Sequence, residues 1–284
     1  MHNLGQAFVS ASQFGLRPFD LARPTSLIDV EDLLKVDDAP CYLAGGTDLF
    51  VQFREGLRPD LVIDINGIED LSEIYANEET LTIGAGVHHE EGVQHSLVSS
   101  NVPGLETAWA LFGNVRTRGM GTLGGNLMAR RERYEGPIIA SALNAELGFL
   151  GADGSTGHSM ADVWADSQPA GALLTYVSIP VAGRPRLAYD RSLRPVFTMA
   201  AVVEEASGGG LSGRAVMGFE WDQPLILDLD LTGAADGKAI VTSSEDIAST
   251  AFGNFPVDRT DSEYLIDAGT AVLSRLLVQL GEPS

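Results

Sequence analysis

The spacing of apolar residues in the first half of the chain alternates between helical and strand periods. Leu27, Val30, Leu33 and Leu34 fall on one helical face, and the preceding Ser26 indicates where that helix begins. Short apolar runs beside turn residues predict buried strands at 41–43, 61–65 and 81–83. Helical patterns cover 49–54, 105–112 and 138–147.

The second half of the chain has mainly strand patterns and ends in a helix. A predicted strand at 173–179 stops at Pro180, and the turn-forming run at 181–185 is a candidate linker. The later elements are predicted as strands at 199–204 and 215–220, a turn at 208–210 and a final helix at 263–280. This order favours an α+β fold with a larger N-terminal domain, 1–180, and a smaller C-terminal domain, 185–284.

The composition agrees with a globular protein of more than one domain. The chain has 284 residues, 44% of them hydrophobic and 7% aromatic, and one compact core rarely holds a chain of this length. The sequence has no apolar run long enough to span a membrane, and residues 1–14 lack the pattern of a secretory signal. We therefore expect no membrane span and a cytoplasmic location.

Charge and cysteine content narrow the candidate partners and the chemistry. A formal net charge of −21 repels nucleic-acid phosphates and anionic lipid surfaces, so both are disfavoured as partners. The single cysteine, Cys41, makes no internal disulfide and supplies too few ligands for an iron–sulfur cluster. We interpret His88, His89 and His95 as surface histidines rather than metal ligands. Any redox chemistry of this chain then depends on an organic cofactor.

The first glycine motif is Ala44-Gly45-Gly46-Thr47-Asp48, between a predicted strand and a predicted helix. Two adjacent glycines allow a sharp turn whose backbone N–H groups share one concavity, which favours a phosphate or pyrophosphate. Thr47 adds a hydroxyl donor, and we expect Asp48 to point away from the anion and to favour the helix start. Taken alone, the Gly-Gly pair also fits an ordinary tight turn.

A second glycine-rich segment runs from Gly119 to Asn126 and ends in Thr122-Leu123-Gly124-Gly125-Asn126. Residues 119–124 match the G-x-G-x-x-G pattern formally, but residues 114–118 are polar, so no apolar strand leads into the glycines. We therefore reject a Rossmann interpretation. By itself this segment is weak evidence for any ligand.

Together, the two segments resemble the FAD-binding subunits of molybdenum hydroxylases, of the carbon monoxide, nicotine and xanthine dehydrogenase type. AGGTDL at Ala44–Leu49 and RGMGTLGGN at Arg118–Asn126 carry the resemblance. Further similar segments are LVIDINGIEDLSEI (61–74), LTIGAG (81–86), LLTYVSIP (173–180) and SEYLIDAGTAVLSRLL (262–277). The resemblance implies a two-subdomain FAD-binding domain of the PCMH type at 1–180. A smaller α+β domain, like the C-terminal domain of carbon monoxide dehydrogenase flavoproteins, would follow at 185–284.

The resemblance also implies the residues that contact non-covalently bound FAD. The two glycine motifs would hold the pyrophosphate from opposite sides, Phe112 would lie against the adenine, and Glu135 would contact the adenosine ribose. Leu173 and Leu174 would approach the flavin, and Tyr189 would cover one face of the isoalloxazine ring. The full expected set is Ala44, Gly45, Gly46, Thr47, Asp48, Ala85, Phe112, Thr122, Leu123, Gly124, Gly125, Asn126, Glu135, Leu173, Leu174 and Tyr189.

The family's flavin subunits work inside larger complexes, so the resemblance implies partners as well. A large subunit would carry molybdopterin and a small subunit would carry 2Fe–2S clusters, in a dimer of heterotrimers. Electrons would pass from the clusters through FAD to a terminal acceptor. This function requires no catalytic side chain and no metal ligand in the present chain. With Cys41 alone, the extra cluster of the hydroxybenzoyl-CoA reductase branch is excluded.

Two other functions are alternatives. A self-sufficient flavin oxidoreductase on the same fold would carry acid–base residues in its own substrate domain, or a histidine joined covalently to the flavin. The short C-terminal half has no convincing counterpart of either. A non-catalytic, FAD-free relative that serves in assembly is the second alternative, and the intact AGGTD and TLGGN motifs argue against it.

Overall fold

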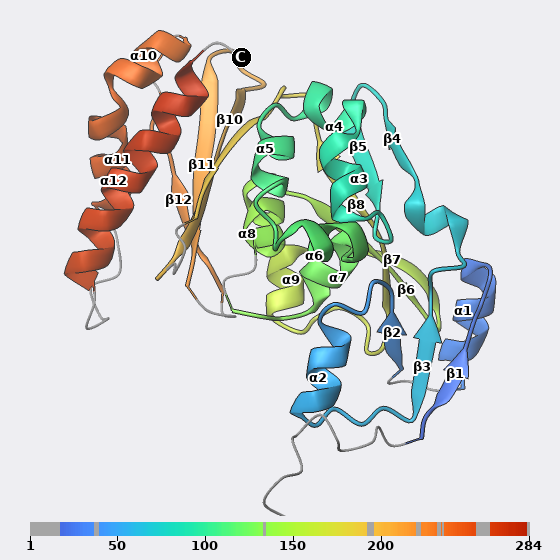
Figure 1. The fold of residues 1–284 in the computed structure, drawn as a ribbon. Coiled ribbons are helices and arrows are strands. Elements are labelled where there is room, and N and C mark those ends of the chain that lie inside the picture. Colours follow the sequence, from blue (N-terminus) through green and yellow to red (C-terminus); the bar gives the residue numbers. More distant parts are fainter. Residues whose placement is uncertain are drawn as a thin grey trace, which may run out of the picture.

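The structure is a computed structural model of the 284-residue chain. It describes residues 18–36, 40–132, 135–191, 196–219, 223–231, 234, 236–253 and 262–282. The strands form a 3-stranded, a 5-stranded and a 4-stranded sheet (Figure 1), and helices pack beside each of them. This mixed architecture confirms the expected α+β class.

The N-terminal part contains the 3-stranded sheet, with the order β1-β3-β2 and parallel pairing. Its elements are β1 (Asp20–Ala22), α1 (Leu27–Leu34), β2 (Cys41–Leu43), α2 (Leu49–Glu55) and β3 (Leu61–Asp64). Parallel neighbours need a crossover connection, which α2 supplies between β2 and β3. A capping box fixes the start of α1, because Ser26 and Asp29 each accept a hydrogen bond from the other's backbone N–H.

The central part contains the 5-stranded antiparallel sheet, in the order β4-β5-β8-β6-β7. Its strands are β4 (Ile74–Ala76), β5 (Thr80–Gly84), β6 (Glu146–Gly151), β7 (Gly154–Ser159) and β8 (Leu173–Pro180), preceded by the 3-10 helix η2 (Glu69–Ser72). Between β5 and β6 lie α3 (His89–Gln94), α4 (Ser96–Asn101), α5 (Leu105–Trp109), α6 (Val115–Met120), α7 (Leu123–Met128) and α8 (Glu135–Ala142), and α9 (Met160–Trp164) follows β7. Apolar residues of the sheet and these helices share the central core.

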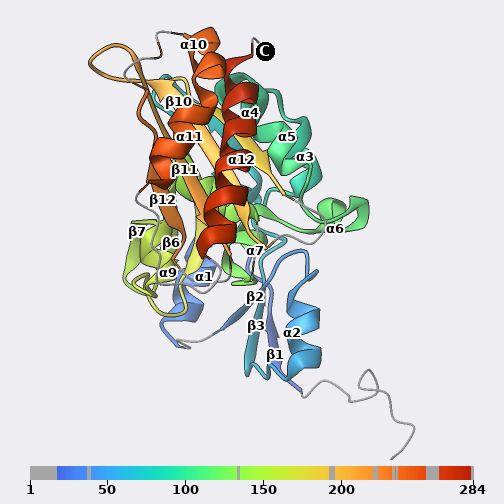
Figure 2. The ribbon, with the colours of Figure 1, turned by 90° about the vertical axis from the view of Figure 1, so that its left-hand side faces the viewer.

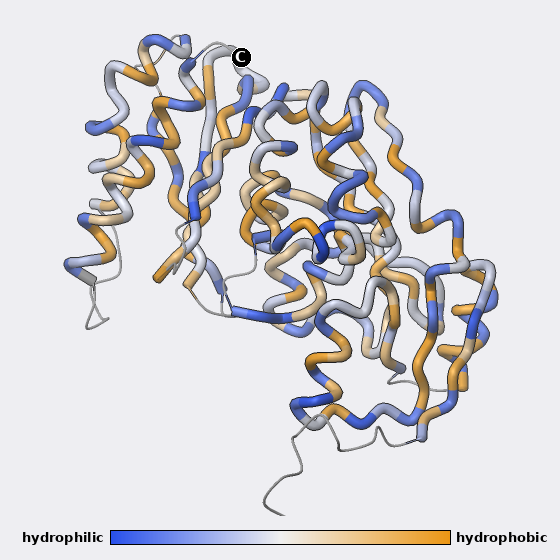
Figure 3. Tube along the Cα trace, in the orientation of Figure 1, coloured by the Kyte–Doolittle hydropathy of each residue, from blue (hydrophilic) through white to orange (hydrophobic). Residues whose placement is uncertain are grey.

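The C-terminal part contains the 4-stranded antiparallel sheet, in the order β12-β11-β10-β9. Its elements are β9 (Arg186–Asp190), β10 (Thr198–Glu205), β11 (Leu211–Gly218), β12 (Leu225–Asp228), α10 (Gly237–Thr242), α11 (Ser244–Phe252) and α12 (Ser262–Gly281). Figure 2 shows α12 lying across the outer face of this sheet. Hydrophobic and hydrophilic residues alternate along α12 (Figure 3), as expected of a helix with one buried face. None of the described helices has both the length and the apolar character that crossing a membrane requires.

Both faces of the C-terminal sheet contribute residues to a core, because successive residues of a strand point in opposite directions. On β9, Ala188 belongs to the core shared with the C-terminal helices, whereas Leu187 and Tyr189 belong to the central core. On β10, Met199 belongs to the core shared with the C-terminal helices and Ala200 belongs to the central core. The inner face of this sheet therefore packs directly against the central part, which holds the second glycine motif.

Two predicted helices extend beyond those of the structure, and the first of them, at 105–112, corresponds to α5, which ends at Trp109. The helical pattern at 138–147 is wrong beyond Ala142, because β6 begins at Glu146 and pairs with both β7 and β8. Asn144 has a left-handed backbone, with φ of 50°, that ends the helical path. A short apolar run does not by itself distinguish a buried helix from a buried strand. Here the hydrogen-bonded pairing with β7 and β8 makes residues 146–151 a strand.

Candidate functional site

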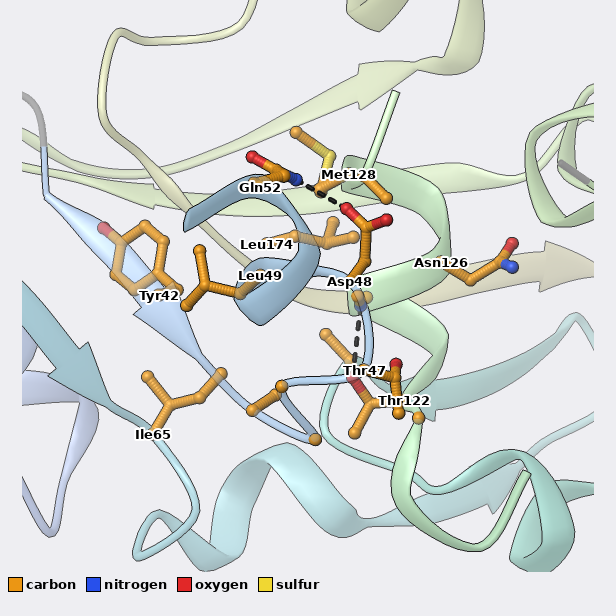
Figure 4. A pocket seen from close by; sticks show the side chains of 18 of the residues that line it. Tyr42, Thr47, Asp48, Leu49, Gln52, Ile65, Thr122, Asn126, Met128 and Leu174 are labelled. Atoms are coloured by element: carbon orange, nitrogen blue, oxygen red, sulfur yellow. Dashed lines mark hydrogen bonds between the residues drawn. The ribbon is translucent and has the colours of Figure 1, made fainter. Parts of the chain in front are cut away.

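A cavity of about 700 Å³ lies where the N-terminal sheet meets the central part. Its walls come from the segment after β2, from α2, from the residues around α6 and α7, and from the start of β8. Figure 4 shows Thr47 just before α2, Thr122 at the start of α7 and Leu174 on β8. Among the described residues, Arg191 alone reaches this wall from the C-terminal part. Both glycine motifs therefore border one cavity.

The first motif presents unpaired backbone donors at the cavity. Gly46 has a φ of 66°, a left-handed conformation that glycine adopts without strain. Within the described part of the chain, the N–H groups of Gly45, Gly46 and Thr47 have no hydrogen-bond acceptor. All three residues line the cavity. Adjacent free donors of this kind form a site suited to an anion.

Gly45 and Gly125 are glycines for two different reasons. A Cβ on Gly45 would lie 1.7 Å from the carbonyl oxygen of Met120, so glycine at this position lets the first motif touch the second. A Cβ on Gly125 would meet only the Thr122 hydroxyl oxygen, at 3.0 Å. Gly125 is therefore the position where the missing side chain leaves room for a ligand.

The second motif forms the start of a helix. Thr122 is the N-cap of α7, and its hydroxyl oxygen accepts from the Gly125 N–H at 3.1 Å. The N–H groups of Leu123 and Gly124 donate to the Val87 and Ala85 carbonyl oxygens, at 3.0 and 2.8 Å. These backbone donors are therefore occupied, unlike those of the first motif. Side-chain groups remain, namely the Thr122 hydroxyl hydrogen and the amide nitrogen of Asn126, whose Oδ1 accepts from the Gly136 N–H at 3.0 Å.

The negative charge of the Asp48 carboxylate is compensated by neighbouring side chains of the protein. It accepts from the Gln52 side-chain amide at 2.6 Å (Figure 4) and from Nε of Arg131 at 2.8 Å. Arg131 also donates to Glu55 at 2.8 Å, and the two carboxylates, Glu55 foremost, raise the pKa of the guanidinium. Asp48 makes no N-cap hydrogen bond to α2. It is nevertheless the N-cap residue of α2, so its charge lies at the helix start as expected, and Arg131 compensates that charge beside the cavity.

A buried ion pair joins the C-terminal part to the cavity. Glu135, in the first turn of α8, is only 6% exposed and pairs with Arg191. Arg191 also donates to the carbonyl oxygen of Leu111 at 2.9 Å. Tyr189, two residues earlier, is buried in the central core, and burial together with the Glu135 charge raises the pKa of its phenol. Both charged partners line the cavity.

His89 is buried, so the interpretation of this residue as a surface histidine is wrong. Its side chain is 3% exposed, and its Nδ1 accepts from the Trp109 indole N–H at 2.9 Å. Its ring packs edge-on against Phe112, with centroids 5.3 Å apart. Burial, and after it the nearby charges of His88 and Arg118, lower the pKa of His89 to about 4.

We expect acid to destabilise the protein through His89. In the unfolded chain this histidine binds a proton as the pH falls through its ordinary pKa of 6.5. In the folded chain it binds the proton only near pH 4, so protonation favours the unfolded chain. Stability from this group is therefore complete above pH 6.5 and is lost between 6.5 and 4, to a limit of about 3 kcal/mol. Urea unfolding across this range, with His89→Phe as the comparison, measures the effect. A variant with the same pH dependence as the natural chain would contradict it.

Most of the expected cofactor contacts border the cavity. They are Ala44, Gly45, Gly46, Thr47, Asp48, Ala85, Phe112, Thr122, Gly124, Gly125, Asn126, Glu135, Leu173 and Leu174. Leu123 and Tyr189 do not line it and pack in the central core instead. The sequence reasoning missed Tyr42, Gln52, His89 and Arg191, which do line it. For Arg191 a signal existed, because it lies two residues after Tyr189 and so on the same side of an extended chain.

The residues present fit FAD. Free backbone donors beside an open glycine suit a pyrophosphate, and the Glu135 carboxylate is an acceptor suited to ribose hydroxyls. Aromatic side chains in the wall, Tyr42 and Phe112, suit flat ring systems. The cavity volume of about 700 Å³ lies within the usual range for ligand pockets.

Two curated relatives are similar to this chain in sequence. The glyceraldehyde dehydrogenase medium chain of Sulfolobus acidocaldarius is 27% identical over 181 residues, 62% of this chain and 64% of that protein. The caffeine dehydrogenase subunit beta of a Pseudomonas species is 35% identical over 132 residues, 45% of this chain and 44% of that protein. The matched regions thus span less than two thirds of the length of either relative.

Solved structures share the whole fold. Quinoline 2-oxidoreductase from Pseudomonas putida 86 superposes with a TM-score of 0.77 at 22% identity, over 94% of this chain and 98% of that one. Carbon monoxide dehydrogenase from Oligotropha carboxidovorans gives a TM-score of 0.76 at 24% identity, over 94% and 99% of the two chains. A family model described as the FAD binding domain in molybdopterin dehydrogenase matches residues 17–182, more than half of the chain. The chain therefore belongs to the family of proteins that carry the FAD-binding domain of molybdopterin dehydrogenases.

Proposed function

We propose that this chain is the FAD-binding, electron-transferring subunit of a molybdopterin-dependent hydroxylase or dehydrogenase. The observation that carries the proposal is the meeting of two glycine motifs at one cavity. One motif offers free N–H groups at Gly45, Gly46 and Thr47, and the other offers open space at Gly125. Membership of the family supplies the class of cofactor.

Each part of the cavity wall has a proposed role toward FAD. The N–H groups of the first motif bind the pyrophosphate, and the Thr122 hydroxyl and the Asn126 amide approach it from the other side. The Glu135 carboxylate, held by Arg191, accepts from the adenosine ribose. The remaining proposed contacts are Ala85 near the pyrophosphate, Phe112 against the adenine, and Leu173 and Leu174 beside the flavin.

The chain's part in the reaction is to bind and orient the cofactor. Bound FAD supplies a ring system that takes up single electrons and gives up pairs, which connects iron–sulfur clusters with two-electron acceptors. Leu173 and Leu174 are buried on β8 and keep water from that side of the cavity. No side chain of the wall is assigned an acid–base step in substrate chemistry.

The proposal extends to partners and to the division of the chain. We propose an iron–sulfur small subunit and a molybdopterin large subunit as partners, in a dimer of heterotrimers. We also propose residues 1–180 as the FAD-binding domain and 185–284 as the C-terminal domain. The change from the 5-stranded sheet at β8 to the 4-stranded sheet at β9 supports that division. The cytoplasmic location stays a prediction, which cell fractionation would test.

The complex should be recoverable from cells that express all three subunits. A tag on this chain should retrieve two further polypeptides, together with FAD, iron and molybdenum. Acid treatment should release the flavin as FAD, because the cavity holds it without a covalent bond. Chromatography of the acid supernatant and metal analysis measure these contents. Recovering FMN, or a flavin that stays on the denatured chain, would contradict the assignment.

The isolated, FAD-loaded chain is the matched control. Without its partners it should reduce no flavin when organic substrates are added, because it offers neither molybdopterin nor an assigned acid–base pair. Anaerobic absorbance at the flavin band reads the reduction directly. Strong reduction by an organic substrate alone would favour the self-sufficient oxidoreductase instead.

A further inference from the structure

We propose that His89 is a further cofactor-binding residue, which donates from Nε2–H to an acceptor on one of the two planar ring systems of FAD. With Phe112 it forms a ring subsite in the cavity wall. The inference rests on the proposed function, since FAD is the ligand. The shared chemistry is a flat heteroaromatic ring with a nitrogen or carbonyl acceptor, a description that fits both adenine and isoalloxazine.

Trp109 fixes which nitrogen of His89 carries the proton. The indole N–H is a donor only, and it donates to Nδ1 of His89 at 2.9 Å. Nδ1 must therefore be the acceptor, and a neutral imidazole must carry its proton on Nε2. His89 is 3% exposed, and its pKa of about 4 keeps it neutral at physiological pH. The residue is thus a fixed donor without a charge.

The local sequence is arranged to permit this contact. A Cβ on Gly92 would lie 2.2 Å from the Trp109 ring, so glycine on α3 gives the indole room to reach His89. Trp109 is itself 2% exposed and belongs to the central core. The orientation of His89 is therefore set by the core and not by the cavity.

One nitrogen of His89 remains free among the described residues, and the residue lines the cavity. Within the described part of the chain, Nε2 has no hydrogen-bond partner, and the imidazole forms part of the cavity wall. A Cβ on Gly121 would lie 3.1 Å from Cδ2 and 3.3 Å from Nε2 of His89, so glycine here leaves that edge of the ring uncovered. The buried Phe112 packs edge-on against the imidazole and lines the same wall. A donor beside an aromatic surface is suited to a heteroaromatic ring.

Substitution of His89 by glutamine or by asparagine tests the roles of Nε2 and Nδ1 separately. Glutamine reaches with its amide to about the place of Nε2, whereas asparagine reaches only to about the place of Nδ1. His89→Asn should therefore weaken FAD binding about tenfold, and His89→Gln should stay within about threefold of the natural chain. His89→Phe, which keeps the buried ring, should weaken binding as His89→Asn does. Fluorescence titration of the apoprotein with FAD gives the dissociation constants, and near-ultraviolet circular dichroism checks the packing around Trp109.

ADP binding and the flavin midpoint potential distinguish the two rings. If the subsite takes adenine, His89→Asn weakens ADP and FAD by the same factor and leaves the potential unchanged. If it takes isoalloxazine, ADP binding is unchanged, the potential shifts, and Phe112 lies beside the flavin instead of the adenine. Equal losses in His89→Gln and His89→Asn, or no loss in any variant that binds FAD, would overturn the role of His89. A natural chain that binds no FAD would instead refute the proposed function.

Discussion

Arginine in place of Gly125 should abolish FAD binding and leave the fold intact. Gly125 is exposed at the cavity, and a Cβ there meets only the Thr122 hydroxyl oxygen, at 3.0 Å. The protein itself therefore has room for a side chain once the Thr122 hydroxyl shifts by a few tenths of an ångström, but that room is what the proposed pyrophosphate occupies. We expect at least a hundredfold loss of affinity, equivalent to about 2.7 kcal/mol or more. Titration of the apoprotein with FAD measures the loss.

Gly119→Arg is the matched control for this substitution. Gly119 lies six positions earlier, is exposed, and a Cβ there has no neighbour within 4 Å. It does not line the cavity, so the added charge and bulk should leave FAD affinity unchanged. Gly125→Ala should fall between the natural chain and Gly125→Arg. If Gly125→Arg kept its full flavin content, the placement of the pyrophosphate at the second motif would be wrong.

The local parts of the fold and the site were predictable from sequence. The start of α1 is marked by Ser26 and Asp29, which form a capping box three residues apart. The first motif follows a strand directly, and its two glycines required no knowledge of the rest of the chain. The capping residues and the paired glycines each depend on only a few neighbouring residues, so the local sequence was enough to identify them.

The non-local parts were not predictable, because the partners lie far apart in sequence. β1 has only three residues and exists through its pairing with β3. Arg131 is 83 positions from Asp48, so sequence offered no reason to pair them. His89 stands among polar neighbours that suggested a surface position, and it is the distant Trp109 that holds it in the core. The occupied N–H groups of the second motif likewise depend on carbonyl oxygens before α3.

The Glu135–Arg191 ion pair should support both the fold and the cofactor. Breaking a buried pair by removing one partner costs roughly 3–5 kcal/mol when both groups are fully buried. Here the Arg191 side chain is 30% exposed and the Glu135 side chain 8%, so water compensates the arginine more than the glutamate. We therefore expect Glu135→Gln to lower the free energy of unfolding of the apoprotein by roughly 1–2 kcal/mol. Arg191→Met should cost more, roughly 2–4 kcal/mol, because it leaves a buried carboxylate without its partner.

Ligand binding then separates the structural role of Glu135 from its proposed contact with the ribose. If its free lone pairs accept from the ribose, Glu135→Gln should weaken FAD and ADP equally, by roughly 1–3 kcal/mol. The flavin potential should stay constant, because the adenosine end is remote from the redox-active ring. The double variant Glu135→Gln/Arg191→Met should recover part of the lost stability without recovering the lost affinity, since only the first effect belongs to the ion pair. Unchanged ADP affinity together with a large shift in potential would place Glu135 beside the isoalloxazine and reverse the orientation of the cofactor in the cavity.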